Sequence, residues 1–226
     1  AASLLSIFSY AISDSTIVKA PTQDSLIQRD FQVSFITPLG TNGTDYEKVE
    51  NKISINIFAG HHGGLNGIEV GGFANSIRYN ATGVQAAGFA NVAQGKTTGT
   101  QASGFVNYTN GLDGMQAAGF INVAKDSVKG GQFAGFANYA HNDFEGIQAS
   151  GFTNVIYGNL NDIQASGFSN VTTGKVKGLQ ASGFANTAKE GIEGIQVSGF
   201  LNLAKTLKGA QIGFINITDS IEEGIM

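Results

Sequence analysis

The sequence contains no cysteine and no tryptophan, and only 2 of its 226 residues are proline. The absence of cysteine excludes a disulfide framework and any thiolate metal site. Lysine and arginine number only 13 and are spread along the chain, and the net charge is −4, so we expect no electrostatic binding of nucleic acid. No stretch reaches the ~20 apolar residues of a membrane-spanning helix, and no transmembrane helix is expected.

Glycine is abundant, with 32 residues, but it does not recur at every third position, which excludes a collagen-like chain. The content of isoleucine, valine and phenylalanine is too high for a disordered linker, because these residues offer apolar surface whose burial offsets the entropy of ordering. Glycine and β-branched residues also disfavour helices. The composition therefore indicates a folded, β-rich protein.

A Gly-Phe pair recurs about every 16 residues, at Phe73, Phe89, Phe105, Phe120, Phe136, Phe152, Phe168, Phe184, Phe200 and Phe214. Every one of these phenylalanines is followed two positions later by asparagine, and nine of the ten units carry glutamine four residues or fewer before the phenylalanine. Such a fixed register is the signature of a repeat architecture. The sequence predicts an all-β fold, a β-solenoid of about ten 16-residue coils with an N-terminal β cap.

A second apolar column lies half a repeat from each phenylalanine, and a coil built of two half-turns would place the two columns opposite each other. We therefore expect both columns to point into one narrow core. A glycine follows most members of the second column and is interpreted as a corner, because glycine tolerates positive φ. The predicted core residues are Phe89, Phe105, Phe120, Phe136, Phe152, Phe168, Phe184, Phe200, Val128, Leu160, Val176 and Ile192.

The glutamine and asparagine columns are expected to form amide ladders, in which each side chain donates a hydrogen bond to the next coil. Contact with a sugar ligand is the alternative interpretation of these amides. The predicted ladder residues are Gln85, Gln101, Gln116, Gln132, Gln148, Gln164, Gln180 and Gln196, together with Asn91, Asn107, Asn122, Asn138, Asn154, Asn170, Asn186 and Asn202.

Charged residues avoid one half of the repeat. After Glu69, every lysine, arginine, aspartate and glutamate of the repeats lies five to ten residues beyond its phenylalanine. The segment that runs from the glutamine past the asparagine carries no charge, and we expect its outer face to meet a partner, because large uncharged surfaces on soluble proteins usually bind something.

The N-terminal part of the chain does not fit the repeat. Residues 1–13, AASLLSIFSYAIS, are uncharged and offer a small-x-small spacing at Ser9 and Ala11, which is typical of a signal peptide. Residues 14–52 are interpreted as a cap that covers the exposed edge of the first coil. Residues 53–226 are predicted to form the solenoid.

The unit Gly-x-Gln-x-x-Gly-Phe-x-Asn, with the segments PLGTNG and GLNGIEVGGFAN before it, resembles the bacterial surface repeat-containing proteins of the Bacteroidetes and spirochaete type. The resemblance covers residues 31–226 and implies an exported, outer-membrane-associated protein without an assigned activity. Curli-type amyloid subunits are similar in their regular Gln, Gly and Asn, but their spacing differs.

Catalytic chemistry is not indicated by any constellation in the sequence. His61 and His62 could bind a metal, but adjacent residues of a strand point to opposite faces. The acidic residues do not form the aligned pair that glycoside hydrolysis needs, and no glycine-rich phosphate loop is followed by a helix. We therefore expect no enzyme activity, no cofactor and no metal.

The favoured function is that of a non-enzymatic, exported surface protein with a structural or adhesive role. Its partner would be a second copy of itself, material of the cell envelope or a host surface. A self-assembling, curli-like fibre or matrix subunit is the main alternative, and a carbohydrate-binding or carbohydrate-active β-helix is the third.

Overall fold

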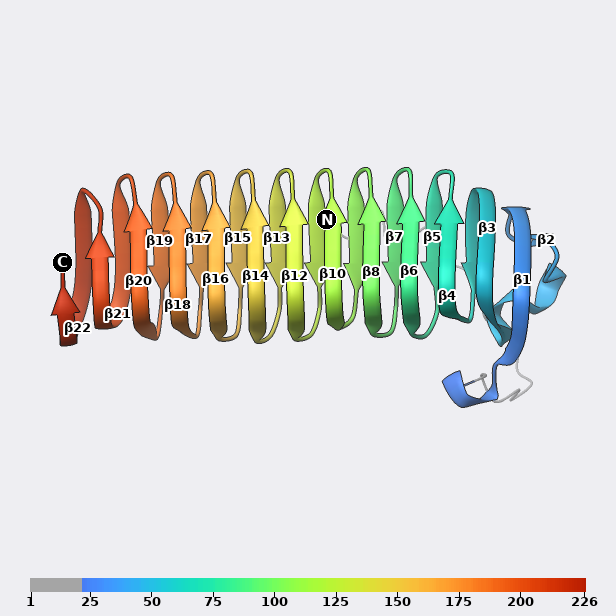
Figure 1. Ribbon diagram of the computed structural model, residues 1–226, viewed down its shortest axis with the longest axis horizontal. Helices are drawn as coiled ribbons and strands as arrows, with labels where there is room; N and C mark the ends of the chain where they lie inside the picture. The colour runs from blue at the N-terminus through green and yellow to red at the C-terminus, as the bar shows by residue number, and fades with distance from the viewer. Residues whose placement is uncertain (1–21) are drawn as a thin grey trace, which may run out of the picture.

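The computed structural model describes residues 22–226, which form a β-solenoid of about 11 turns with about 16 residues in each turn. The predicted all-β solenoid is thereby confirmed. Figure 1 shows coils that follow one another along a straight axis, each with one strand in front and one behind. The predicted signal segment, residues 1–13, lies outside the described residues.

Each regular coil contains one long and one short strand. The long strands are β4 (Gly64–Gly71), β6 (Ala81–Ala87), β8 (Thr97–Ser103), β10 (Leu112–Ala118), β12 (Val128–Ala134), β14 (Phe144–Ser150), β16 (Leu160–Ser166), β18 (Lys175–Ser182) and β20 (Gly191–Ser198). The short strands are β5 (Ala74–Ile77), β7 (Ala90–Ala93), β9 (Val106–Thr109), β11 (Ile121–Ala124), β13 (Ala137–Ala140), β15 (Thr153–Ile156), β17 (Ser169–Thr172) and β19 (Ala185–Ala188).

Strands of successive coils pair in parallel and in register. In the central coils, β14 pairs with both β12 and β16, so that Gln148 is aligned with Gln132 and Gln164. On the other side β15 pairs with β13 and β17, and Asn154 is aligned with Asn138 and Asn170. Identical residues therefore stack in columns along the axis.

The corners of the coil differ from the expected ones. The Gly-Phe pair forms a bend between the long and the short strand, at the upper edge in Figure 1, and a polar turn closes the coil at the lower edge. The glycines that we expected to mark a corner lie inside the long strands. Gly146 has φ of +124°, and a Cβ there would lie 2.0 Å from the carbonyl oxygen of Gly130, so close stacking of the backbones explains the glycine.

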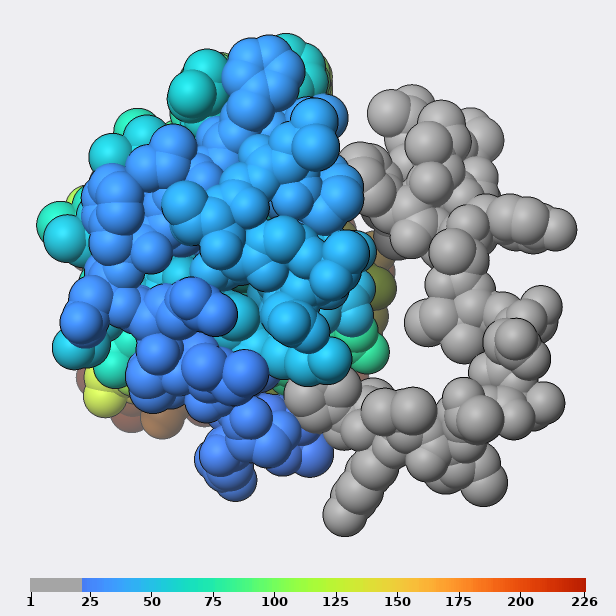
Figure 2. All heavy atoms as spheres, turned by 90° about the vertical axis from the view of Figure 1, so that its right-hand side faces the viewer, coloured from blue at the N-terminus to red at the C-terminus, as the bar shows by residue number. Residues whose placement is uncertain are grey.

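The first coil begins within the region that we assigned to the cap. After the 3₁₀ helix η2 (Gln23–Ser25), β1 (Ile27–Ile36) pairs in parallel with β3 (Val49–His62), while β2 (Leu39–Gly40) returns antiparallel to β1. The 3₁₀ helix η3 (Gly43–Lys48) connects β2 to β3. Figure 2 shows this N-terminal segment covering the end of the coil stack.

At the other end, β21 (Leu201–Ile212) and β22 (Ile215–Ile225) form longer strands that continue the parallel pairing. Neither η2 nor η3, nor any other helix within residues 22–226, is long and apolar enough to span a membrane.

The interior has two halves. The half behind the polar turns is apolar and contains the second apolar column, which packs against a column of the short strands that includes Ala124, Ala140 and Ile156. The members that we predicted for this core, Val128, Leu160, Val176 and Ile192, are 0–3% exposed, which confirms their assignment. The half next to the Gly-Phe bend is filled by amide side chains.

Candidate functional site

The glutamine column forms a continuous ladder in the interior. Each glutamine Nε2 donates to the Oε1 of the glutamine one coil nearer the N-terminus, at 2.7–2.9 Å. The predicted members of this ladder are all no more than 1% exposed, and the hydrogen bonds confirm its existence. These members are Gln85, Gln101, Gln116, Gln132, Gln148, Gln164, Gln180 and Gln196.

The asparagine column forms a second ladder beside the first, with the opposite direction of donation. Each asparagine Nδ2 donates to the Oδ1 of the asparagine one coil nearer the C-terminus, at 2.9–3.0 Å. The same nitrogen also donates to a backbone oxygen of the next coil, as Asn154 does to Ala165 at 2.6 Å. The amide groups are thus paired within the protein and are not available to a ligand.

The predicted asparagine ladder comprises Asn91, Asn107, Asn122, Asn138, Asn154, Asn170, Asn186 and Asn202. These side chains are 0–1% exposed. The sugar-contact interpretation of the amide columns is inconsistent with this burial, because a ligand cannot reach the amides.

The glutamine ladder ends on a buried ion pair that sequence reasoning missed. Glu69 replaces glutamine in this column, and its Oε2 accepts from Gln85 Nε2 at 2.9 Å. Its Oε1 lies 2.6 Å from Nε2 of His62, whose Nδ1 donates to the carbonyl oxygen of Gly64 at 2.9 Å. Burial alone would lower the pKa of His62, but the Glu69 carboxylate and the bond to Gly64 raise that pKa above its ordinary value.

His61 lies on the other face of the strand from His62 and has different neighbours. Its Nδ1 is 2.9 Å from Ser76 Oγ, and its Nε2 is 3.5 Å from Glu47, which also pairs with Arg78. Burial lowers the pKa of His61. The two histidines are therefore separate, and within residues 22–226 no three His, Asp or Glu side chains are grouped as a metal site would require.

The phenylalanine column lies on the outside of the solenoid, which corrects our prediction of an inward column. From Phe73 to Phe200 these residues are 38–42% exposed, and their rings stack on each other with centroids 4.7–5.1 Å apart. The Gly-Phe bend interrupts strand alternation, and so the ring turns outward while the glutamine and asparagine on either side point inward. The residues concerned are Phe89, Phe105, Phe120, Phe136, Phe152, Phe168, Phe184 and Phe200.

The stacking also limits what the rings can bind. Both faces of an inner ring such as Phe136 or Phe152 are covered by its neighbours, so only the ring edges reach solvent. Stacking of a nucleobase or a sugar needs a free aromatic face. The column, which we call the Phe ridge, is suited to apolar packing along its edge rather than to stacking of a ligand.

A shallow groove runs beside the Phe ridge on the side of the long strands. Its floor consists of the small residues that follow each glutamine, such as Ala102, Ser103, Ala149 and Ser150. The same columns continue the groove towards the C-terminus with Ala165, Ser166, Ala181 and Ser182. Most of these side chains are alanine, serine or glycine, and Val70, Phe133 and Val197 interrupt the floor in their own coils.

The column that precedes each glutamine lies two residues from the floor on the same outward side of the long strands, and we call it the wall column. It includes Val84, Met115, Ile147 and Ile195, which are 41–47% exposed. Gly131 interrupts this column, but the ring of Phe133 folds over it, since a Cβ at position 131 would lie 2.6 Å from Phe133 Cε2. The apolar wall is therefore continuous through this coil.

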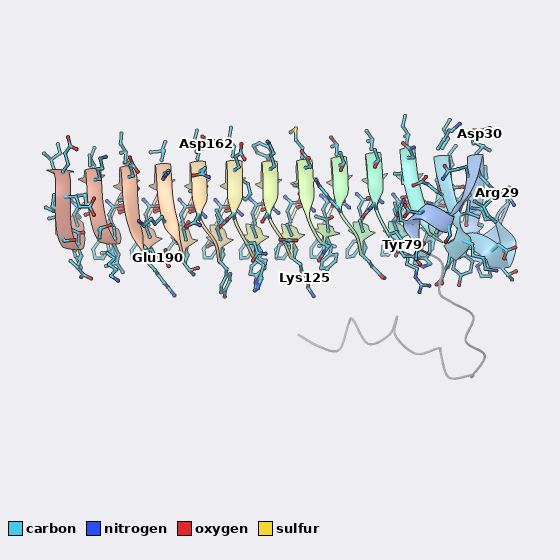
Figure 3. All side chains as sticks on the ribbon, turned by 90° about the horizontal axis from the view of Figure 1, so that it is seen from below. Arg29, Asp30, Tyr79, Lys125, Asp162 and Glu190 are labelled. Carbon is cyan, nitrogen blue, oxygen red and sulfur yellow. The ribbon has the colours of Figure 1, made fainter. Side chains whose placement is uncertain are left out.

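Charged side chains occupy the polar turns and the beginning of the long strands. Figure 3 views the solenoid from the side of the polar turns, where Lys125 and Glu190 point away from the coils, and Asp162 projects from the long strands. The ion pairs here are exposed, as between Lys96 and Asp113 at 3.2 Å, and such pairs contribute little to stability. The Phe ridge and the groove thus form an uncharged surface, which is bordered by charged residues towards the polar turns.

The chain matches no protein-family model, and comparison with curated proteins and with solved structures gives no match either.

Proposed function

We propose that this chain is a non-enzymatic repeat protein that acts by binding through its uncharged surface, which consists of the Phe ridge and the adjoining groove. The observation that carries the proposal is the size of this surface. Nine phenylalanines, from Phe73 to Phe200, are 38–42% exposed and together present ~700 Å² if each side chain offers ~200 Å². The largest apolar patch of a typical monomeric protein covers only ~300–600 Å².

The interior supports a structural role. Two amide ladders and the parallel backbone pairing repeat without interruption, so that each coil holds its neighbours in the same way. A stiff rod of this kind keeps many identical binding elements in line, which suits an adhesive or scaffold protein. The resemblance of the repeat unit to bacterial surface repeat proteins supports the further proposal that the chain is exported to the cell surface or outer membrane.

Two glutamates placed in the groove floor test the proposal. Ala117→Glu with Ala165→Glu adds two charges to the uncharged surface, whereas Thr98→Glu with Asn161→Glu adds the same two charges to exposed positions of the polar part. Asn161 and Ala165 belong to the same strand, β16. We expect the groove variant alone to lose association, measured by sedimentation of the purified protein alone and with outer-membrane vesicles.

Equal association of the two variants would contradict the proposal, as would a wild-type chain that binds neither itself nor the vesicles. If both variants still form thioflavin-positive fibres, this result favours the alternative of a fibre subunit. Location is tested separately, by fractionating cells that express the full gene product. Recovery in the cytoplasm alone would contradict export.

A further inference from the structure

We infer that the groove receives the Phe ridge of a second copy of this chain, so that two solenoids lie side by side, parallel and coil for coil. The inference rests on the proposed function, because it names the partner of the same surface. It follows from three properties of that surface: its periodicity, its area and its lack of charge.

Periodicity restricts the partner most strongly. The rings of the Phe ridge are spaced 4.7–5.1 Å apart, and the groove floor repeats once per coil in the same stack. A ridge that fits this floor along its length must have the same spacing, which is the distance between paired β-strands. A second copy has that spacing and also the same number of coils.

The arrangement of ridge and groove also determines the symmetry. Each copy carries one ridge and one groove side by side, because the ring lies at the bend and the groove floor lies in the long strand just before it. A two-fold axis parallel to the solenoid axis places the ridge of each copy in the groove of the other. A two-fold axis along the strands would instead place ridge against ridge and leave the grooves facing each other, unfilled. The first arrangement is isologous and closed.

The straight stack in Figure 1 allows this contact to continue over many coils. The rings from Phe73 to Phe200 alone offer each partner ~700 Å², close to the ~800 Å² that a standard stable protein interface buries per partner. Alanine, serine and glycine leave room for the rings in the coils between Val70, Phe133 and Val197, which narrow the floor where they occur. The wall column supplies further apolar contact through Ile147 and Ile195, exposed by 42% and 45%.

The charge distribution favours a protein partner over a lipid surface. Segments that bind anionic membranes carry clusters of lysine and arginine beside the apolar surface. Here the charged residues lie in the polar turns and near the start of the long strands, where Lys129 is aligned with Glu145 and Lys177 with Glu193, and the net charge is −4. The border of the uncharged surface thus carries both signs of charge and not the basic cluster that would hold it against a headgroup layer.

Sedimentation velocity and site-directed cross-linking test the inference. We expect the wild-type chain to be a dimer at micromolar concentration, and Ala117→Glu with Ala165→Glu to raise the dissociation constant at least 100-fold. The control with Thr98→Glu and Asn161→Glu should change it less than threefold. Circular dichroism should be the same for all three proteins, because the substituted side chains lie outside the core.

Because the chain contains no cysteine, single cysteines report the register without background. A mixture of Ala149→Cys and Phe152→Cys chains should form disulfide-linked heterodimers, since the floor of one coil faces the ring of the same coil. Ala149→Cys mixed with Phe184→Cys, two coils away, should not. Cross-linking of the second pair and not of the first would overturn the proposed register.

A wild-type chain that is monomeric at 100 μM overturns the inference. If that monomer still sediments with outer-membrane or phosphatidylcholine vesicles through the same surface, the proposed function stands and the occupant is a membrane or one of its components. If the monomer binds neither, both proposals fail.

Discussion

Two kinds of ladder run the length of this solenoid at almost the same spacing, one inside and one outside. The glutamines and asparagines are buried and hydrogen-bonded from coil to coil, whereas the phenylalanines are stacked on the surface with their edges in solvent. The polar residues are thus inside and the aromatic residues outside. A buried amide is stable only when its donors and acceptors are paired. In this protein the repeat supplies the partner, because the same amide occurs at the same place in the next coil.

The comparison predicts that breaking an inner ladder costs the most. Asn154→Ala removes the bonds that this side chain donates to Asn170 at 3.0 Å, to Ala165 at 2.6 Å and to Gln148 at 3.3 Å. It also leaves Asn138 without its acceptor at 2.9 Å. At ~1–3 kcal/mol for each buried group left unpaired, we expect a loss of about 4 kcal/mol in the free energy of unfolding. Urea denaturation measures it, with Asn161→Ala, at an exposed position, as the control. A loss below about 1 kcal/mol would show that the ladder is not a source of stability.

The end of the glutamine ladder provides the next test. Glu69→Gln keeps the shape of the side chain but removes the carboxylate that pairs with His62 and accepts from Gln85. We expect a loss of about 3 kcal/mol at pH 6, because breaking a buried ion pair leaves a charge without its partner. Gln85→Glu, one coil further on, would place a second carboxylate in the ladder and should also be destabilising.

The same pair gives the wild-type protein a pH dependence. Because the pKa of His62 is raised in the folded chain, its protonation contributes stability that is complete below the ordinary histidine value of about 6.5 and is lost as pH rises through the raised value. His61, whose pKa is lowered, acts in the opposite sense as pH falls below 6.5. Denaturation at several pH values above 6.5 should show stability falling in the wild type, and a flat profile in Glu69→Gln.

The outer ladder should be less sensitive than the core. Phe152→Ala removes a ring that is already 40% exposed, and we expect a loss of about 1–2 kcal/mol, mainly from contacts with the rings on either side. Phe144 is fully buried in the apolar half of the neighbouring interior, and Phe144→Ala should cost about 4 kcal/mol. Equal losses for the two variants would contradict the assignment of inside and outside.

The smallest effect concerns a position where one coil departs from the others. Asp162 occupies the column of glycines inside the long strands and has φ of +99°, a conformation that disfavours residues with a side chain. Asp162→Gly should stabilise the protein by about 1 kcal/mol. Asn161→Gly next to it, where φ is not positive, serves as the control and should destabilise.

The sequence predicts the period, the parallel columns and the amide ladders, because each of these follows from repetition alone. The inside-outside assignment of Phe152 could not be derived in the same way. Gln148, Phe152 and Asn154 have the same parity in sequence, and alternation would place them on one face. The Gly-Phe pair is a bend rather than part of a strand, so the alternation of inward and outward side chains does not hold at the ring.

The buried ion pair could have been predicted from the sequence, because both of its residues depart from the repeat at positions that alternation places inside. Glu69 stands in a glutamine column, and His62 is aligned with Ile77, a member of the buried column two residues beyond the asparagines. Two departures from the repeat at inward positions of the first coils indicate a contact between them. The groove, in contrast, could not be predicted from the pattern of apolar residues. It depends on the direction in which the Gly-Phe bend turns the ring relative to the small residues before it.

The two amide ladders donate in opposite directions, and this determines the net dipole of the side-chain amides along the solenoid axis. In a helix the peptide dipoles add along the axis and leave partial charges at its two ends. Here the side-chain amides of each coil point one way in the glutamine ladder and the other way in the asparagine ladder, so that their dipoles oppose each other within the coil. Each added coil brings almost no net side-chain dipole, and the amide ladders therefore leave little partial charge at either end of the stack, whatever the number of coils.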